Sequence, residues 1–375
     1  MKIKPIRGQT SVDFFMGCNS PNGFYSLYSE LQRPVKGVRR YLIKGGAGTG
    51  KSSIMRRAAA EFGPKDALTE LIHCSSDPNS LDGVILHTGK TSMVDATPPH
   101  VIEPTYPGGF ETVINLCEYF DEEKLESRLE DIVVLQSANG ECHRKCRGLL
   151  KCADILLRDN FYYVESCTDF AKIGALSRRI CKAELKTSAS GTGMEHRRLL
   201  SAVTNQGVIT YTSTASALCD RFYLLRDEYG VSSNALLGQI RDAALERGYD
   251  LFSCYCPFSP ESKLEHLFIP ELRLGFVTQS RFNDFSDIAS GKCGRCKVIN
   301  YTRFTDLDRL RLKKQYLSFN KKAAAELVDA AVDHLKQAKV IHDELESMYT
   351  DAVDFTRVTE KTDQILSRMA KRYQA

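Results

Sequence analysis

A glycine-rich segment followed by a lysine and a serine constrains this chain more than any other feature. Residues 45–52 are Gly-Gly-Ala-Gly-Thr-Gly-Lys-Ser, which fits the phosphate-binding pattern G-x-x-x-x-G-K-[ST]. The segment 38–44 before it predicts a short buried strand, and the segment 52–60 after it predicts a helix. Because the pattern requires a strand, a glycine turn and then a helix, the context favours a P-loop within an α/β fold.

Each residue type in such a loop has a defined task. Backbone N–H groups and the positive end of the helix would surround a β-phosphate. Lys51 would reach the β- and γ-phosphates, and the Ser52 hydroxyl would ligate Mg²⁺. ATP is the default nucleotide, because no N-K-x-D guanine motif lies at a useful position. We therefore expect an ATP and Mg²⁺ site formed by Gly45, Gly46, Ala47, Gly48, Thr49, Gly50, Lys51, Ser52 and Ser53.

Carboxylates near the ends of two further predicted strands are candidates for the same site. The apolar run 92–94 ends in Asp95, which is typical of a strand that delivers a magnesium-binding aspartate, although ordinary strand ends have the same pattern. A predicted strand over 69–72 is followed by His73, Asp77 and Asp82, which could orient a water or an acceptor. The alternative is a polar turn with a helix cap. We assign catalytic roles to Lys51, Asp95 and Asp82 and metal ligation to Ser52 and Asp95, with His100 as a weaker candidate.

The chain is a tandem duplication. Segments 22–24, 41–44, 150–156 and 168–173 return at 206–208, 223–226, 335–341 and 353–358, at separations of 182 to 185 positions. We expect an active P-loop copy over 1–190 and a degenerate copy over 195–375, with 187–193 as the linker. Each copy would contain a P-loop NTPase-like β-α-β core and a helical extension. In the second copy the extension carries an apolar stripe over 327–348, which predicts a helix packed onto its own α/β layer.

The second copy has lost the residues that bind phosphate and metal. In the register of the duplication, Gly45 falls on Asp227, Lys51 on Ser233 and Ser52 on Asn234, whereas Gly48 is kept as Gly230. The counterpart of Asp95 is Thr278. An aspartate would place negative charge where phosphate oxygens should lie. The sequence thus predicts one Mg-nucleotide site per chain, with the second copy as a scaffold or regulatory half.

The duplicated pattern resembles a bacterial family of tandem P-loop ATPases, some of them labelled nucleotide kinases. The resemblance covers essentially the whole chain and lies in segments 45–53, 73–84, 94–100, 244–250 and 264–267. It implies ATP binding but supplies no reaction. Members of that family commonly carry the loop in both halves, and this chain departs from them in the second.

Composition excludes several other classes of protein. The net charge is only +4, and no apolar run approaches the roughly 20 residues needed to span a bilayer. The first residues lack the apolar core of a secretory signal, so we expect a cytoplasmic protein whose 13 cysteines are mostly free thiols. We expect no membrane partner and no nucleic-acid partner, because acidic residues dilute the basic segment 309–314.

Two sets of cysteines are candidate metal sites. Cys293 and Cys296 form a lone C-x-x-C that could join Cys254 and Cys256, but the spacing does not specify zinc. Cys142 and Cys146 share a helix face, where buried thiols are the simpler interpretation.

Three functions remain open. The first is a Mg-dependent ATPase with a single site in the first copy. The second is a kinase for a nucleotide or another small acceptor. The third is a nucleotide-gated interaction module with little turnover, whose protein or small-molecule partner is unknown.

Overall fold

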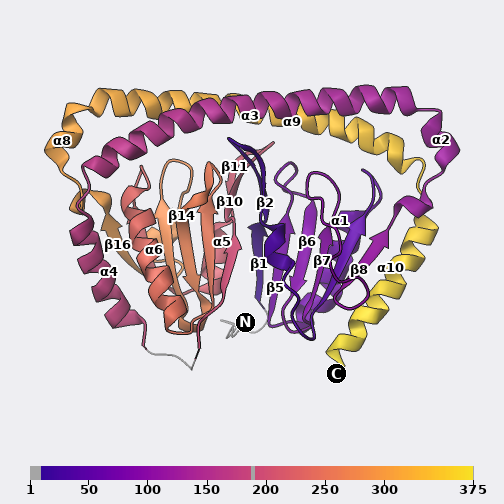
Figure 1. Cartoon of the computed structure of the whole chain (residues 1–375), viewed down its shortest axis with the longest axis horizontal. Helices are drawn as coiled ribbons and strands as arrows, with labels where there is room; N and C mark the ends of the chain where they lie inside the picture. Colours follow the sequence, from indigo (N-terminus) through magenta and orange to yellow (C-terminus); the bar gives the residue numbers. More distant parts are fainter. Residues whose placement is uncertain (1–9, 187–190, 375) are drawn as a thin grey trace.

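The computed structural model describes residues 10–186 and 191–374. The N-terminal segment and residues 187–190 of the predicted linker lie outside the described residues. The chain is α/β, with two mixed sheets of six strands each, as expected for a duplicated α/β fold. The two sheets stand side by side in Figure 1, with two long helices lying across them.

The two sheets share one strand order. In the first sheet the strand before the glycine-rich segment lies between two parallel neighbours, and a single strand, β6, runs antiparallel to both of its own neighbours. The order is β1 (Thr10–Phe15), β5 (Leu68–His73), β6 (Leu81–Leu86), β7 (Thr91–Asp95), β4 (Arg39–Lys44) and β8 (Glu111–Asn115). The second sheet repeats this order as β9 (Glu195–Arg198), β13 (Leu251–Cys256), β14 (Ser259–Ile269), β15 (Leu274–Gln279), β12 (Arg221–Arg226) and β16 (Arg295–Asn300).

Local structure follows the sequence pattern closely. The strand predicted over 38–44 is β4, and the helix predicted over 52–60 is α1 (Lys51–Phe62). Its counterpart in the second copy is α6 (Val231–Glu246). The register of the duplication is confirmed at the sheet level, because Asp95 pairs with Ile43 and Thr278 pairs with Leu225 at matching places.

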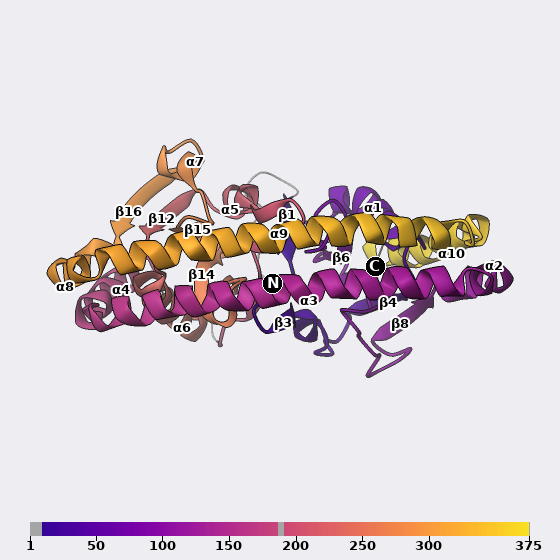
Figure 2. The same ribbon diagram turned by 90° about the horizontal axis from the view of Figure 1, so that it is seen from above.

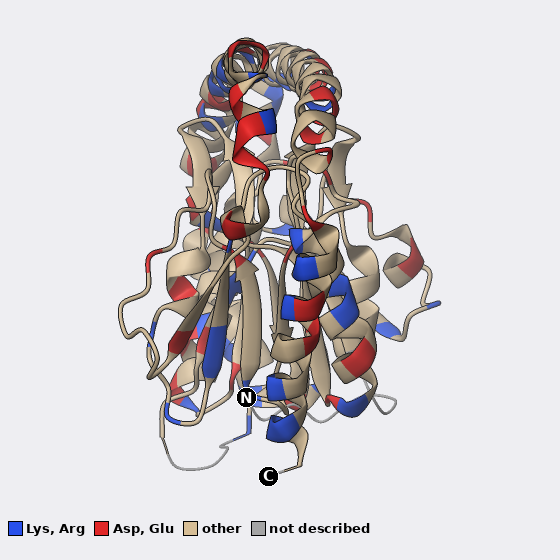
Figure 3. Ribbon diagram, turned by 90° about the vertical axis from the view of Figure 1, so that its right-hand side faces the viewer, with Lys and Arg blue, Asp and Glu red and all other residues tan. Residues whose placement is uncertain are grey.

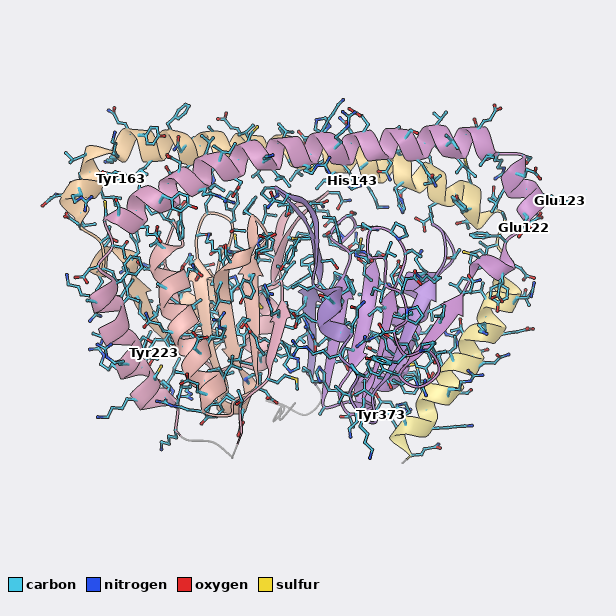
Figure 4. All side chains as sticks on the ribbon, in the orientation of Figure 1. Glu122, Glu123, His143, Tyr163, Tyr223 and Tyr373 are labelled. Carbon is cyan, nitrogen blue, oxygen red and sulfur yellow. The ribbon has the colours of Figure 1, made fainter. Side chains whose placement is uncertain are left out.

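Two long helices connect the copies. α3 (Leu129–Ser166) and α9 (Lys314–Thr350) lie side by side across the top of both sheets, which Figure 2 shows from above. A buried amide pair joins them, since Asn160 donates to Leu317 O at 3.0 Å and Asn320 donates to Asn160 Oδ1 at 3.0 Å. Figure 4 places His143 near the middle of α3.

The prediction for the apolar stripe of α9 holds only in part, because the stripe packs on α3 as well as on residues of its own copy. Ala324, Val328 and Ala331 pack with Cys146 and Leu150 of α3, together with residues of the second copy's loops and hairpin. The C-terminal half of α9 then continues over the first copy. An amphipathic pattern shows that one face of a helix is buried, but it does not say which surface buries it.

The last helix of each copy packs on the other copy. α10 (Phe355–Ala370), reached from α9, adds Ile365 and Met369 to the core that contains Ile54 and Phe62 of α1. Beyond α10, the Tyr373 hydroxyl donates to Asp66 of the first copy at 2.8 Å. α4 (Phe170–Glu184) packs in the same manner on α6 of the second copy. Figure 4 labels Tyr373 and, at the opposite end of the molecule, Tyr223, whose hydroxyl donates to Glu184 of α4 at 2.7 Å.

The two sheets meet through their edge strands. Phe15 and Leu199 exchange backbone hydrogen bonds of 2.9 and 3.0 Å. Beside them the fully buried Glu70 accepts from Arg198 at 2.6 and 3.1 Å and contacts His87 Nε2 at 2.7 Å. One hydrophobic core runs from the first sheet into the second through this junction.

Candidate functional site

The glycine-rich loop, residues 45–50, joins β4 to α1 at the carboxyl end of the first sheet. Gly48 and Gly50 have positive φ angles of 67° and 83°. A Cβ on Gly45 would lie 2.6 Å from Thr49 Oγ1, which donates to Gly46 O at 2.9 Å. The loop shape therefore requires glycine at these positions.

The N-terminus of α1 has no side chain of its own that caps it. Its cap residue, Gly50, supplies no side-chain hydrogen bond, and no acidic residue occurs in its first turn. The first N–H groups of a helix have no partner within the helix, and they carry its partial positive charge.

Lys51 and Ser52 begin this helix and face neighbouring strands. Lys51 Nζ donates to the carbonyls of Gly45 and Gly46 at 2.8 and 2.7 Å, and it lies 3.7 Å from Asp95 Oδ2. The Ser52 hydroxyl accepts from Leu81 N at 2.9 Å. The lysine is thus held across the loop by two neutral carbonyl oxygens and lies near one carboxylate.

The predicted carboxylates gather beside Lys51. Asp95 ends β7, next to β4, and Thr97 donates to it through both its backbone N–H and its hydroxyl. Burial raises the pKa of Asp95, Lys51 and Thr97 oppose this rise, and the nearby carboxylate of Asp82 adds to it. Asp82, buried on β6, lies 3.0 Å from His100 Nε2. The three residues assigned as catalytic therefore lie in one cluster.

Tyr28 completes this cluster, and no sequence motif pointed to it. Its ring is buried and lies 4.9 Å from the ring of His100. Burial raises its pKa, and the charges of Asp82 and Asp95 raise it further. Within the described chain, the Tyr28 hydroxyl and His100 Nδ1 make no hydrogen bond although both are buried. Two unsatisfied polar atoms beside a carboxylate pair are what a site for a polar ligand or ordered water would contain.

Two other candidates make structural contacts instead. His73 lies 2.8 Å from Asp13 Oδ1 and 2.7 Å from Pro78 O, and it packs on Tyr211 of the second copy. Asp77 accepts from Asn79 N at 3.1 Å and pairs with Lys339 of α9 at 3.4 Å. These contacts favour the polar-turn interpretation for Asp77, whereas His73 is the last residue of β5. The helix cap in that interpretation is wrong, because the strand β6 follows the turn.

The last turn of α9 covers the glycine-rich loop. A Cβ on Gly48 would lie 2.3 Å from Thr350 Oγ1 and 2.7 Å from Glu346 O. A Cβ on Gly46 would lie 3.5 Å from Tyr349, and one on Gly50 would lie 3.8 Å from Phe355 at the start of α10. Residues some 300 positions away in the chain thus form part of this site, and the sequence gives no local sign of them.

The corresponding loop of the second copy is closed by its own side chain. Asp227 accepts from the N–H groups of Tyr229, Gly230 and Ser233 at 3.2, 3.0 and 2.8 Å. α6 begins directly after Gly230, two residues earlier than α1 begins in the aligned sequence. The carboxylate of Asp227 therefore occupies the helix N-terminus where an anion would bind.

Two further contacts define this closed loop. Asn234 Oδ1 accepts from Leu264 N at 2.9 Å, as Ser52 does from Leu81, which supports the predicted register. Lys263, on β14, pairs with Glu265 at 3.4 Å and lies against Gly230, where a Cβ would be 2.1 Å from its Cε.

The described residues contain no cluster of three or more His, Cys, Asp or Glu side chains that could hold a metal ion. All 13 cysteines are free thiols, and Cys254 and Cys256 are buried in β13. Within the described ranges, no helix is long and apolar enough to cross a bilayer.

No protein-family model, curated protein or solved structure matches this chain.

Proposed function

We propose that the chain is a Mg-dependent ATP-binding protein that hydrolyses ATP at one site, in the first copy. The observation that carries this proposal is the convergence of Lys51, Ser52, Asp82 and Asp95 around a glycine loop and an uncapped helix N-terminus. This arrangement satisfies the strand–loop–helix context that the phosphate-binding pattern requires.

The residues present fit Mg²⁺ bound together with a nucleotide. Magnesium prefers oxygen ligands and is commonly held by one or two protein groups plus phosphates and water, so a small donor set is sufficient. The Ser52 hydroxyl and the Asp95 carboxylate would hold it, and the ion would neutralise charge on the phosphates. The unsatisfied Tyr28 hydroxyl and His100 Nδ1 support the presence of a further polar group at the same place.

The remaining chemistry belongs to the protein. The N–H groups of the loop and of α1 would bind the β-phosphate, and Lys51 would exchange its two carbonyl partners for phosphate oxygens. Asp82, held by His100, is the candidate for orienting the attacking water. Stabilisation of charge on the transferred phosphoryl group supplies most of the rate in such a site.

The second copy supports a single site per chain. Asp227 satisfies the N–H groups that would receive phosphate, and Thr278 stands at the place of Asp95. A carboxylate fixed in the loop repels a second anion. We expect a stoichiometry of one ATP per chain.

The test is phosphate release from Mg-ATP by the purified chain, with Lys51→Ala as the blank. Lys361→Gln serves as a matched control for loss of one positive charge, because Lys361 is half-buried, as Lys51 is. Turnover well above the blank, and equal in the control, supports the proposal. ATP binding that is unchanged in Lys51→Ala would refute it.

One observation favours a second candidate, a nucleotide-gated interaction module. The last turn of α9 lies on Gly46 and Gly48, and α9 extends to the second copy along α3. A change in the loop on nucleotide binding would reach both copies through this helix. In that case ATP binds with negligible turnover, and amide exchange in α9 changes when Mg-ATP is added. Identical exchange with and without Mg-ATP would exclude gating.

A further inference from the structure

A cavity on the opposite side of the first copy gathers three arginines. It has a volume of about 350 Å³ and lies between β4, β8 and α10, near the start of the strands and away from the glycine-rich loop. Its lining is Arg39, Tyr41, Gly108, Thr112, Arg368 and Arg372. Figure 3 shows basic residues gathered toward the C-terminal end of α10, on the side of the first sheet.

The geometry of the elements makes these side chains converge. Arg39 and Tyr41 are two apart on β4, so they share one face of the strand. Arg368 lies in the last turn of α10, and Arg372 lies four residues later in the 3-10 turn Lys371–Tyr373 that continues the helix, so both line the same cavity. The three arginines also lie close enough to Tyr41 to act on its pKa. Burial raises the pKa of Tyr41, and the charges of Arg39, Arg372 and Arg368 all oppose that rise.

Two of the three guanidinium groups are held in place by neutral acceptors. Arg39 donates to Gly108 O at 2.8 Å and lies 3.5 Å from Thr112 Oγ1. Arg372 donates to Gly89 O at 3.0 Å and also to Gly37 O. Across residues 10–186 and 191–374, none of the three arginines forms an ion pair with a carboxylate.

Three like charges around one cavity repel each other, and within the described part of the chain no ion pair with a carboxylate offsets that repulsion. A bound anion would offset it, and arginine is the side chain best suited to phosphate, since its planar fork makes paired hydrogen bonds. The volume lies at the lower end of the range for small-molecule pockets. We propose that this cavity is a binding site for a small phosphorylated molecule, separate from the glycine-rich loop.

A ligand bound in this cavity would connect two elements that adjoin the glycine-rich loop. β4 leads directly into the glycine-rich loop, and α10 follows the turn of α9 that covers it. A phosphoryl group held by Arg39 from β4 and by Arg368 from α10 would fix these elements relative to each other.

The experiment is calorimetric titration of the full chain with inorganic pyrophosphate, in the Lys51→Ala background to weaken binding at the loop. Arg368→Gln removes an exposed arginine that makes no hydrogen bond or ion pair among the described residues, so folding should be unaffected. We expect pyrophosphate affinity to fall at least about tenfold in Arg368→Gln. Lys361→Gln, with the same charge change on the same helix, should alter it by less than about twofold.

Two further titrations test which anion binds and whether the guanidinium group recognises it. Inorganic phosphate in place of pyrophosphate shows whether one phosphoryl group is sufficient or two are required. Arg368→Lys keeps the charge and loses the fork, so an intermediate affinity supports phosphate recognition. Absence of pyrophosphate binding in the Lys51→Ala chain would overturn the inference, as would equal affinities in Arg368→Gln and Lys361→Gln. Neither result depends on ATP hydrolysis, so the two proposals can fail separately.

Discussion

Replacing Asp227 by alanine tests the idea that a carboxylate stands in for phosphate in the second copy. The variant leaves three N–H groups, those of Tyr229, Gly230 and Ser233, without their acceptor. Asp227 is only 2% exposed, so its carboxylate is shielded from solvent in the folded protein. An unsatisfied buried donor costs ~1–3 kcal/mol, so three of them cost about 3 kcal/mol after water enters the vacated space. Urea unfolding of the full chain should show a midpoint lower by about 1 M.

A second measurement tests why Asp227→Ala loses stability. If the vacated loop accepts an anion, inorganic phosphate should stabilise Asp227→Ala more than the unchanged protein, by about 2.7 kcal/mol at one hundred times the dissociation constant. Chloride at equal ionic strength is the salt control. Asp227→Asn keeps an acceptor oxygen without the charge, so it should lose less stability and gain less from phosphate.

Two results would refute this reasoning. The first is an unchanged urea midpoint in Asp227→Ala. The second is equal stabilisation of the variant and the unchanged protein by phosphate, because phosphate bound at any other site acts on both.

The junction and the covered loop yield two further predictions. Glu70→Gln should cost about 3–5 kcal/mol in urea unfolding, since it leaves Arg198 buried without its charge partner. Burial raises the pKa of Glu70, but Arg198 and His87 outweigh this effect and hold the pKa well below its ordinary value of 4.5. The stability that the ionised Glu70 contributes is therefore present above pH 4.5 and is lost as the pH falls further. Glu70→Gln should lack this loss at low pH, and an identical pH profile of stability in the two proteins would contradict the role given to Glu70. Gly48→Ala should destabilise the chain more than Gly37→Ala, because both have positive φ but only Gly48 lies against Thr350; equal thermal midpoints would show that α9 does not rest on the loop.

The sequence predicted the elements that are encoded locally. The strand–loop–helix around Gly45 to Ser52 follows from glycine spacing and flanking periodicity, and the structure has it at the predicted place. Asp95 follows from an apolar run that ends in a carboxylate, and the duplication places Thr278 at the same register of the second sheet. Local patterns and an internal repeat constrain each other, so both could be established from one chain.

The contacts that depend on distant parts of the chain were not predictable. The apolar stripe of α9 indicated burial but not that α3 would provide the surface. Thr350 lies against Gly48 only because α9 crosses from one copy to the other. Tyr28 carries no motif, and its place beside Asp82 appears only after the strands are assembled. The sequence predicts that Asp227 repels phosphate, but it does not predict the three hydrogen bonds that Asp227 accepts from the loop.

The exchange of terminal helices has a consequence for biosynthesis. The core of the first copy includes Ile365 and Met369 of α10, which the ribosome makes roughly 250 residues after the last strand of the first sheet. At typical elongation rates of about 5–20 residues per second, that sheet waits on the order of 10–50 s for its final helix. During this interval the apolar face that α10 later covers stays exposed to solvent and to other nascent chains. A chain interrupted before residue 355 would leave the glycine-rich loop attached to an unfinished core, so translation must pass through the second copy before the site of the first can be completed.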